Sequence, residues 1–285
     1  MILIDFNGVA MANIFAGRLD IEENLVRHMV LNTIRMYRKK FKNKYGEIVI
    51  CCDAGGNWRR ETFPNYKMNR AKDVKDKGEE DKWAEIWRLL SMVRDELKEN
   101  FPYKVVHVHG CEADDVIAAL AEYTNEFGNY EDVMIVSRDK DFAQLQRFPN
   151  IKQFEPVSKK MIKTENPQAN LFEHICRGDG SDGVPNVLSP DDIFLREGRQ
   201  TPLSTKKLTA WSSAEDLRKA MGEDIYRNFM RNKKMIDLSE TPDALKQEII
   251  NSFESQDVAP KSKVMPFLMK KRCRNLLEVV GDFTQ

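Results

Sequence analysis

The first two thirds of the chain alternate short apolar runs with stretches in which apolar residues recur at helical spacing. Candidate buried strands lie at 2–6, 47–52, 104–109 and 132–137, and helical patterns lie at 21–43, 83–97 and 111–126. Strands that alternate with helices pair in parallel, because each connection must cross a face of the sheet. The pattern therefore predicts an α/β fold with a central, twisted, parallel-type sheet and helices on both faces. After about residue 170 the sequence is helical and rich in loops, which predicts a smaller helical C-terminal part.

Acidic residues stand where these predicted strands end or where the next helix begins. A single Asp after a strand is most often a turn or helix-capping residue. Parallel strands, however, bring their carboxyl ends to one edge of the sheet, and carboxylates crowded there repel each other unless cations neutralise them. We therefore predict a site for hard divalent ions bound through oxygen. Its candidate ligands are Asp5, Asp53, Glu112, Asp114, Asp139, Asp141, Asp179 and Asp182.

Two parts of this acidic set have simpler explanations. The acids of 111–115 open a helix, where the helix dipole alone favours them, and this explanation suits Asp115 best. The segment 178–183 is rich in glycine and is typical of a plain surface loop. The pair Asp139 and Asp141 argues more strongly for metal, since two carboxylates at one strand-to-helix turn can face a shared ion.

The charge of the chain is balanced in total but not along its length. Lys plus Arg and Asp plus Glu are 45 each, so the net charge neither supports nor excludes a nucleic-acid partner. Residues 35–44 hold six cations and no anion, 59–77 hold seven cations and three anions, and the tail from 261 is basic. Only these local excesses of positive charge bear on phosphate binding.

Cysteine and histidine suggest no competing site. The five cysteines contain no CxxC pair, which argues against a disulfide framework or a zinc site and favours a reducing cytoplasm; we expect each to be a small buried residue. For the histidines, which lack a Ser or Cys partner in a motif, we expect packing roles. No signal peptide and no apolar run of ~18 residues appears, so we expect no membrane contact. The histidines are His28, His107, His109 and His174.

Five motifs, in order, resemble those of the flap endonuclease family of 5′ nucleases, also known as 5′-3′ exonucleases, and most of all its T-even bacteriophage members. They are LIDFNG (3–8), the basic WRR and NYKMNR segments after Asp53, CEADD (111–115), SRDKDFAQL (137–145) and RGDGSDGVPN (177–186). Two further segments, 24–40 and 226–238, resemble the phage members, so the likeness covers most of the chain. The resemblance implies a PIN-like 5′ nuclease core.

The resemblance also implies two magnesium ions, for which manganese is the expected substitute. The first ion would be held by Asp5, Asp53, Asp114 and Asp139, with Glu112 nearby or acting through water. The second would be held by Asp141 and Asp182, with Asp179 in support. Two ions roughly 4 Å apart can clamp an in-line displacement at phosphorus.

Basic residues that match the family would complete the chemistry. The resemblance assigns catalytic roles to Arg59 and Lys67, which would reach the scissile phosphate, and to Asp139. A solvated basic helix is the simpler explanation of the same stretch. Expected nucleic-acid contacts are Arg60, Tyr66, Arg70, Lys206 and Lys207.

One motif departs from the family. Gly183 stands where Asn is usual, and the Gly-x-Gly hairpin that grips duplex DNA is missing. Lys206 and Lys207 resemble a displaced start of the basic helix that follows that hairpin, so we expect an altered duplex grip and no bound potassium ion.

The resemblance divides the chain into a nuclease core at 1–175 and a helical duplex-binding domain with a basic tail at 176–285. Residues of about 67–95 match the family's arch or bridge, beneath which a single-stranded 5′ end passes. Because 71–81 is charged and poor in apolar residues, we expect order there only on substrate. The closing residues 281–285 have the composition of a sliding-clamp peptide, although a frayed terminus is the simpler expectation.

The expected activity is hydrolysis of RNA primers and of DNA 5′ ends or flaps during replication, in the cytoplasm of an infected host if a phage encodes the chain. The substrates would be DNA and RNA–DNA hybrids with 5′ ends or flaps. A sliding clamp and a single-stranded-DNA-binding protein are candidate partners of a monomer. The alternative from another class is a structure-specific DNA-binding protein without catalysis, against which the complete acidic set argues.

Overall fold

A six-stranded sheet forms the centre of the computed structural model, which describes residues 1–16, 22–126, 130–196 and 198–285. The strand order is β3-β2-β1-β4-β5-β6, in which β6 alone runs antiparallel to its neighbour. The predicted parallel α/β sheet is therefore confirmed. The strands are β1 (Ile2–Asp5), β2 (Ile48–Cys51), β3 (Lys104–Val106), β4 (Val133–Val136), β5 (Ile151–Glu155) and β6 (Lys160–Ile162).

The strands β5 and β6 were not predicted, because neither forms a continuous apolar run. In β5 the exposed Lys152 interrupts the buried positions, and β6 has three residues, none of them buried. By contrast β1, β2 and β4 are buried at every position, as expected for strands covered on both faces.

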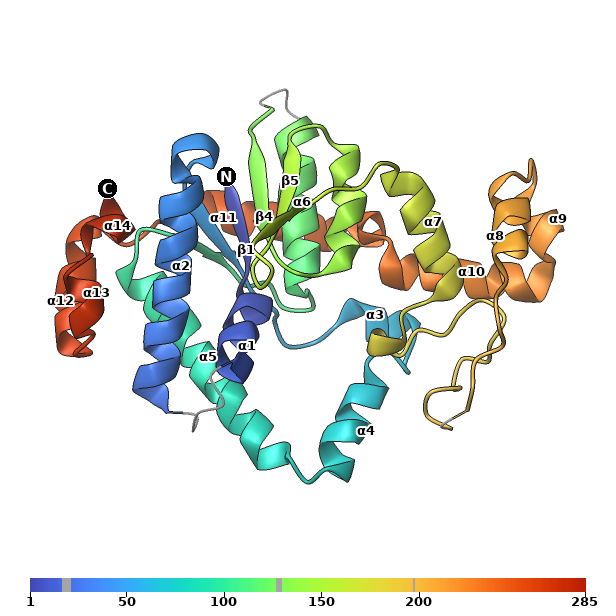
Figure 1. The fold of residues 1–285 in the computed structure, drawn as a ribbon, viewed down its shortest axis with the longest axis horizontal. Coiled ribbons are helices and arrows are strands. Elements are labelled where there is room, and N and C mark those ends of the chain that lie inside the picture. Colours follow the sequence, from blue (N-terminus) through green and yellow to red (C-terminus); the bar gives the residue numbers. More distant parts are fainter. Residues whose placement is uncertain (17–21, 127–129, 197) are drawn as a thin grey trace.

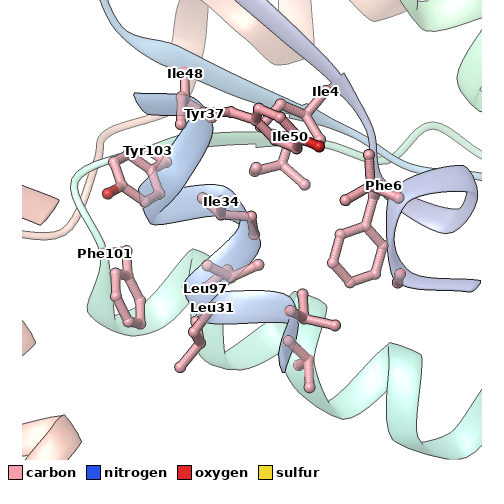
Figure 2. Close-up of a cluster of buried hydrophobic side chains, with 14 of the residues drawn as sticks. Ile4, Phe6, Leu31, Ile34, Tyr37, Ile48, Ile50, Leu97, Phe101 and Tyr103 are labelled. Carbon is pink, nitrogen blue, oxygen red and sulfur yellow. The ribbon is translucent and has the colours of Figure 1, made fainter. Parts of the chain in front are cut away.

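Alternate residues of the central strands feed two hydrophobic clusters, one on each face of the sheet. Ile2 and Ile4 of β1 point into the first cluster, while Leu3 points into the second. The first cluster is covered by α1 (Phe6–Ala16), α2 (Glu23–Tyr45) and α5 (Glu80–Asn100), which lie together on one side of the sheet (Figure 1). Figure 2 shows side chains of β1, β2, α2 and α5 packed against one another in this cluster.

The second face is covered by α6 (Ala113–Glu126) and α11 (Asp243–Ser255), together with the 3-10 helix η1 (Lys140–Arg147). Helix α6 contributes a run of small and branched apolar residues to this cluster, and α11 packs across α6 and β3. The helical patterns predicted at 21–43, 83–97 and 111–126 correspond to α2, α5 and α6. Helix α1, which begins directly after β1, was not predicted.

The arch segment is helical rather than unstructured. After α3 (Trp58–Thr62), helix α4 (Met68–Asp76) buries none of its residues and is followed through Gly78 by α5. The two helices extend away from the sheet and meet at their far ends (Figure 1). The expectation of order only on substrate is therefore wrong for this segment, because α4 is held by contacts with α5 and with the 3-10 helix η2 (Gly180–Asp182).

The helical C-terminal part has its own hydrophobic cluster. It is built from α7 (Pro167–Arg177), α8 (Thr205–Ser212), α9 (Leu217–Met221) and α10 (Glu223–Ile236), and it also buries Phe63 and Tyr66 from the segment after α3. This cluster lies beside the sheet, on the side where α3 and η2 approach each other (Figure 1).

The last residues return to the nuclease core. After the 3-10 helices η3 (Leu238–Glu240) and η4 (Lys261–Lys263), helices α12 (Val264–Lys270), α13 (Arg274–Leu277) and α14 (Gly281–Thr284) pack near α2. Phe283 is fully buried, and Asp282 forms an ion pair with Arg35. The expected frayed terminus is therefore wrong, because a buried aromatic side chain and a partly buried ion pair fix the end of the chain.

Two simpler expectations about composition can also be compared with the structure. All five cysteines are buried and free, as predicted. None of the described helices is both long and apolar enough to cross a membrane.

Candidate metal centre

The order of the strands explains why distant acids meet. Strand β1 lies between β2 and β4, so the chain after each of these three strands emerges at the same edge of the sheet. Asp5 ends β1, Asp53 follows β2 and Asp139 follows β4. The connection from β1 leads to β2 on one side and the connection from β4 leads to β5 on the other, and ligand sites of open α/β sheets form at such a point. Asp114, in the first turn of α6, faces the same edge, since its carboxylate interacts with those of Asp5 and Asp139.

Local hydrogen bonds hold the first of these carboxylates in place. Asp5 caps α1, since its Oδ1 accepts from the backbone N–H of Gly8 at 2.8 Å, while its Oδ2 accepts from the hydroxyl of Ser137 at 2.7 Å. A Cβ at position 8 would lie 2.3 Å from Asp5 Oδ2, so any other residue would displace this carboxylate. Glycine in the DFNG motif thus leaves room for Asp5 at the acidic edge.

Asp53 is fixed from two sides. Its Oδ2 accepts from the side-chain amide of Asn7 at 2.6 Å, and its Oδ1 accepts from the backbone N–H of Ala113 at 2.7 Å. The second bond ties the beginning of α6 to the end of β2. Asn7 was not among the predicted site residues, although its place two residues after Asp5 was a usable signal.

The first group, which we define as Asp5, Asp53, Asp114 and Asp139, carries more negative charge than its surroundings balance. Burial, and then the charge of Asp53, raises the pKa of Asp5 to about 6. Burial, followed by Asp139 and Asp5, raises the pKa of Asp114 well above its ordinary value. Raised pKa values in a cluster of buried carboxylates are typical of a site that binds a divalent cation.

The second group, defined as Asp141, Asp179 and Asp182, lies next to the first. An unexpected residue, His174, contacts two of its acids. Asp141 follows Asp139 in η1, and the two Asp of the 178–183 loop flank η2. Nδ1 of His174, in the last turn of α7, lies 3.3 Å from Asp141 Oδ1, and its Nε2 lies 3.2 Å from Asp179 Oδ2. The expected packing role of His174 is therefore wrong.

Asp141 has an oxygen that the protein leaves unsatisfied. Burial and the charge of Asp139 raise the pKa of Asp141 to about 7. The Oδ1 atom is buried, and no group in the described part of the chain makes a hydrogen bond with it, although His174 Nδ1 lies 3.3 Å away. A buried acceptor without a partner is costly, and a bound cation would satisfy it.

Cations surround the rest of the second group. Lys140 Nζ lies 2.9 Å from Asp179 Oδ2, Lys67 Nζ lies 3.6 Å from Asp182 Oδ2, and Arg70 forms an ion pair with Asp182. Burial raises the pKa of Asp179, but the hydrogen bonds from His174, Ser181 and Lys140 outweigh it and lower that pKa well below the ordinary value.

The loop that carries Asp182 is docked against the start of the arch. The backbone N–H of Lys67 donates to the carbonyl of Asp182 at 2.8 Å, and the Arg70 side chain donates to the carbonyl of Ser181 at 2.8 Å. At Gly183 the backbone has a φ of 70°, and a Cβ would lie 3.1 Å from the carbonyl of Asn65. Gly183, which stands where Asn is usual in the family, thus lies where the backbones of the loop and the arch approach closely.

Glu112 connects the acids to the basic segment. It is paired with Lys67 and accepts from the hydroxyl of Tyr66 at 2.9 Å, and the same hydroxyl lies 2.9 Å from Asp182 Oδ2. Burial would raise the pKa of Glu112, but Lys67 and then Arg59 outweigh it and lower the pKa to about 2. Tyr66 is only 2% exposed, so the structure does not place its ring for stacking on a base.

Arg59 is buried, and its guanidinium lies 3.4 Å from Glu112 Oε2 at the border of the acidic site. Its side chain is 2% exposed, and the guanidinium binds both oxygens of Asp115 at 2.9 and 3.0 Å. Its Nε also donates to the carbonyl of Met235 at 3.0 Å. In this structure Arg59 therefore links α3, α6 and α10, which a sequence pattern cannot reveal because Asp115 itself looked like a simple helix-dipole residue. Trp58 next to it is buried and donates to the same Asp115 carboxylate.

The remaining basic candidates lie on the surface. Arg60 on α3 is exposed, and so are Lys206 and Lys207 in the first turn of α8. The backbone of Lys207 is capped by Ser204, so α8 presents a well-formed N-terminus with both lysines in solvent.

A cavity of about 500 Å³ opens beside the first group, within the range of roughly 300–1,000 Å³ found for ligand pockets. Its walls include Asn7 and Asp53 on the acidic side and Trp87 and Arg94 of α5 on the other. The cavity thus lies between the carboxylates and the base of the arch.

Comparison with known proteins identifies the family. Residues 1–173 match the family described as 5′-3′ exonuclease, N-terminal resolvase-like domain, and residues 166–283 match the family described as T4 RNase H, C terminal. The predicted resemblance to the 5′ nucleases is therefore confirmed. The chain belongs to the 5′-3′ exonuclease family.

Individual relatives support this assignment. Ribonuclease H of Enterobacteria phage T4 is 32% identical over 294 residues, which cover 99% of this chain and 95% of that protein. The T5 5′-exonuclease with bound zinc ions has a TM-score of 0.63 at 16% identity and covers 98% of this chain and 99% of its own. A complex of a T5 flap endonuclease with DNA and metal ions has a TM-score of 0.62 at 16% identity, with 98% of both chains covered. The chain is thus a nuclease of the 5′ nuclease type.

Proposed function

We propose that this nuclease depends on divalent metal ions and hydrolyses phosphodiester bonds of RNA primers and of DNA 5′ ends or flaps during DNA replication. The observation that carries the proposal is the convergence of carboxylates from separate motifs at one sheet edge, where burial and mutual repulsion raise the pKa of Asp5 to about 6 and that of Asp141 to about 7. A protein has little reason to maintain such repulsion unless cations bind there.

We propose two ions, magnesium in the cell with manganese as a substitute. The first group would hold one ion, with Glu112 at its border, and the second group would hold the other. The residues fit hard ions: the donors are carboxylate oxygens, and Asp141 Oδ1 is buried without a hydrogen-bond partner among the described residues. Ions bound there would lower the pKa of an attacking water and neutralise charge at the scissile phosphate.

We assign the contact with the scissile phosphate to Lys67 and Arg70. Both now pair with carboxylates of the site, and the Arg70 side chain is 54% exposed, so it is free to turn toward a substrate. When the carboxylates are neutralised, their cations become available to a phosphate at the same edge, where they stabilise the charge of the transition state. Asp139 belongs at the border of both groups, and Arg59 would support this arrangement from behind rather than touch the substrate.

The proposed nucleic-acid surface extends from the site in two directions. Arg60 continues the basic surface of α3, and Lys206 with Lys207 offers the N-terminus of α8 to the phosphates of a duplex. The T5 relative in complex with DNA supports DNA as the ligand. We retain the division into a core at 1–175, with an arch at about 67–95, and a duplex-binding part at 176–285. The cavity between Asp53 and α5 would take the terminal nucleotide of the unpaired strand.

The biological setting is proposed from the phage relative. A nuclease that removes primers acts in the cytoplasm of the infected host, as a monomer, next to a sliding clamp and a single-stranded-DNA-binding protein. The buried Phe283 makes it difficult for residues 281–285 to serve as a clamp peptide unless α14 detaches from α2.

Cleavage of an RNA–DNA hybrid labelled at its 5′ end tests the proposal. We expect short labelled products with magnesium and none with EDTA. Binding of branched DNA without any metal-dependent product would refute the enzymatic proposal and support the catalytically inactive DNA-binding protein. A crystal soaked in manganese tests the number of ions, because two anomalous peaks are expected, one at each group.

A further inference from the structure

His174 is a nitrogen donor placed among carboxylates that the proposed function assigns to the second ion. Within the described residues, Asp141, His174 and Asp179 form a group whose potential ligand atoms all lie within 4.8 Å of one another. His174 is 17% exposed and comes from α7, whereas Asp141 comes from η1 and Asp179 follows the end of α7. Three separate turns of the chain therefore converge on one point.

The two nitrogens of His174 have different environments. Nε2 makes a hydrogen bond of 3.2 Å with Asp179 Oδ2. An ionised carboxylate only accepts, so this nitrogen must carry the proton. In the neutral imidazole Nδ1 then presents a lone pair, and at 3.3 Å it faces Asp141 Oδ1, which is itself an acceptor without a hydrogen-bond partner in the described part of the chain.

Two acceptors at this distance repel unless a proton or a metal cation lies between them. A separation of about 3 Å is what two ligands of one ion show when each lies roughly 2.1 Å from the ion at a right angle. Lys140 does not fill this role, because its ammonium group contacts the other partner, Asp179, at 2.9 Å.

We infer that Nδ1 of His174 and Oδ1 of Asp141 bind the same divalent ion, and that Asp179 orients the imidazole through Nε2. The inference rests on the proposed two-ion function and names the ligand set of its second site. It gives Asp179 a specific supporting role, since histidine ligands of metals usually donate their other N–H to a carboxylate that fixes the ring.

The consequence is a difference in metal preference between the two sites. The first group offers only oxygen donors, which suit magnesium. A nitrogen donor favours transition-metal ions over magnesium, zinc much more strongly than manganese. The second site should therefore discriminate against magnesium more strongly than the first.

Manganese bound to the full-length protein without DNA tests this inference without any cleavage. Pulsed electron paramagnetic resonance detects a nitrogen atom bound directly to Mn²⁺, and we expect such a coupling in the wild type. His174→Gln should abolish it and weaken one of two Mn²⁺ sites by roughly tenfold or more. His174→Asp should restore Mn²⁺ binding through oxygen, without the nitrogen coupling and with several-fold better competition by Mg²⁺.

His28→Gln, on α2, is the matched control and should leave both the coupling and the two affinities unchanged. Two bound Mn²⁺ ions without nitrogen coupling in the wild type would overturn the inference while leaving the two-ion function intact; His174 would then be an imidazolium paired with both carboxylates. Absence of Mn²⁺ binding would overturn both. If His174→Gln does not fold, the wild-type spectrum alone decides.

Discussion

The two groups of carboxylates differ in how the protein itself balances their charge. In the first group the acids face mainly one another, so burial and repulsion raise the pKa of Asp5 to about 6 and that of Asp114 well above its usual value. In the second group Lys140 and Arg70 already pair with Asp179 and Asp182. Asp141, next to the first group, has a raised pKa as well.

This difference indicates different energetics of ion binding. With the two proposed ions, an ion at the first group would relieve repulsion, whereas an ion at the second would compete with ammonium and guanidinium groups that are already there. Cations released from the second group would then become available to the substrate. Occupancy of the second site would therefore depend more on the position of the basic residues than occupancy of the first.

Asp139 lies between the groups, and its replacement should have the largest effect. Asp139→Asn keeps the cap of η1 but removes a charge that both ions use, so we expect turnover of a flap substrate to fall by roughly three orders of magnitude. Binding of branched DNA should change little, because the basic surface remains. Gel-shift and single-turnover assays measure the two quantities. Unchanged turnover would refute the assignment of the site.

Replacing Arg59 tests whether its ion pair with Asp115 stabilises the fold. Arg59→Met leaves Asp115 as a buried charge without its bidentate partner, so we expect the free energy of unfolding to fall by roughly 3–5 kcal/mol. Arg60→Met, its exposed neighbour, should change stability by less than about 0.5 kcal/mol. Urea denaturation measures both. A loss of turnover with wild-type stability would instead return Arg59 to the scissile phosphate.

The pH dependence of stability separates the groups without substrate. Asp5 has a folded pKa of about 6, above its unfolded value of 3.8, so its contribution to stability is fully present below about pH 4 and is lost as pH rises through 6. Asp141 behaves alike with a folded pKa of about 7. Between pH 5 and 8 these two carboxyl groups together should cost the metal-free protein roughly 4 kcal/mol.

Thermal unfolding in EDTA measures this loss, and saturating Mg²⁺ should remove most of it. Asp5→Asn should flatten the pH dependence, whereas Asn in place of the exposed Asp257 should not. If the unfolding temperature of the metal-free protein rises between pH 5 and 8, the proposed imbalance of the first group is wrong.

The first group was predictable from sequence and the second only in part. Asp5, Asp53 and Asp139 follow buried strands, and a parallel sheet brings such positions together whatever the details of packing. His174 carried no local signal: Asp141 lies 33 residues earlier in the chain, and only the docking of α7 against η1 brings the two together. The burial of Arg59 could not be predicted either, because it depends on the ion pair with Asp115 in another helix.

Contacts with distant parts of the chain explain why two expectations about disorder were wrong. The charged segment around α4 forms a helix because the η2 loop binds its first turn, a contact between residues more than a hundred positions apart. The C-terminus is ordered because Phe283 enters the core cluster beside Phe101. Composition measures what a segment can bury by itself and therefore misses surface provided by the rest of the fold.

Lys67 should show the smallest effect and tests the coupling between the second group and the substrate. Lys67→Met would remove the proposed charged contact to the phosphate, so we expect single-turnover cleavage at saturating Mg²⁺ to slow by roughly 10- to 100-fold. Lys67→Arg should recover part of this loss, and Arg70→Met should cost less because its side chain is 54% exposed. If Lys67→Met is slow at low Mg²⁺ but matches the wild type at saturating Mg²⁺, the lysine only organises the carboxylates, and the cations of the second group do not transfer to the substrate.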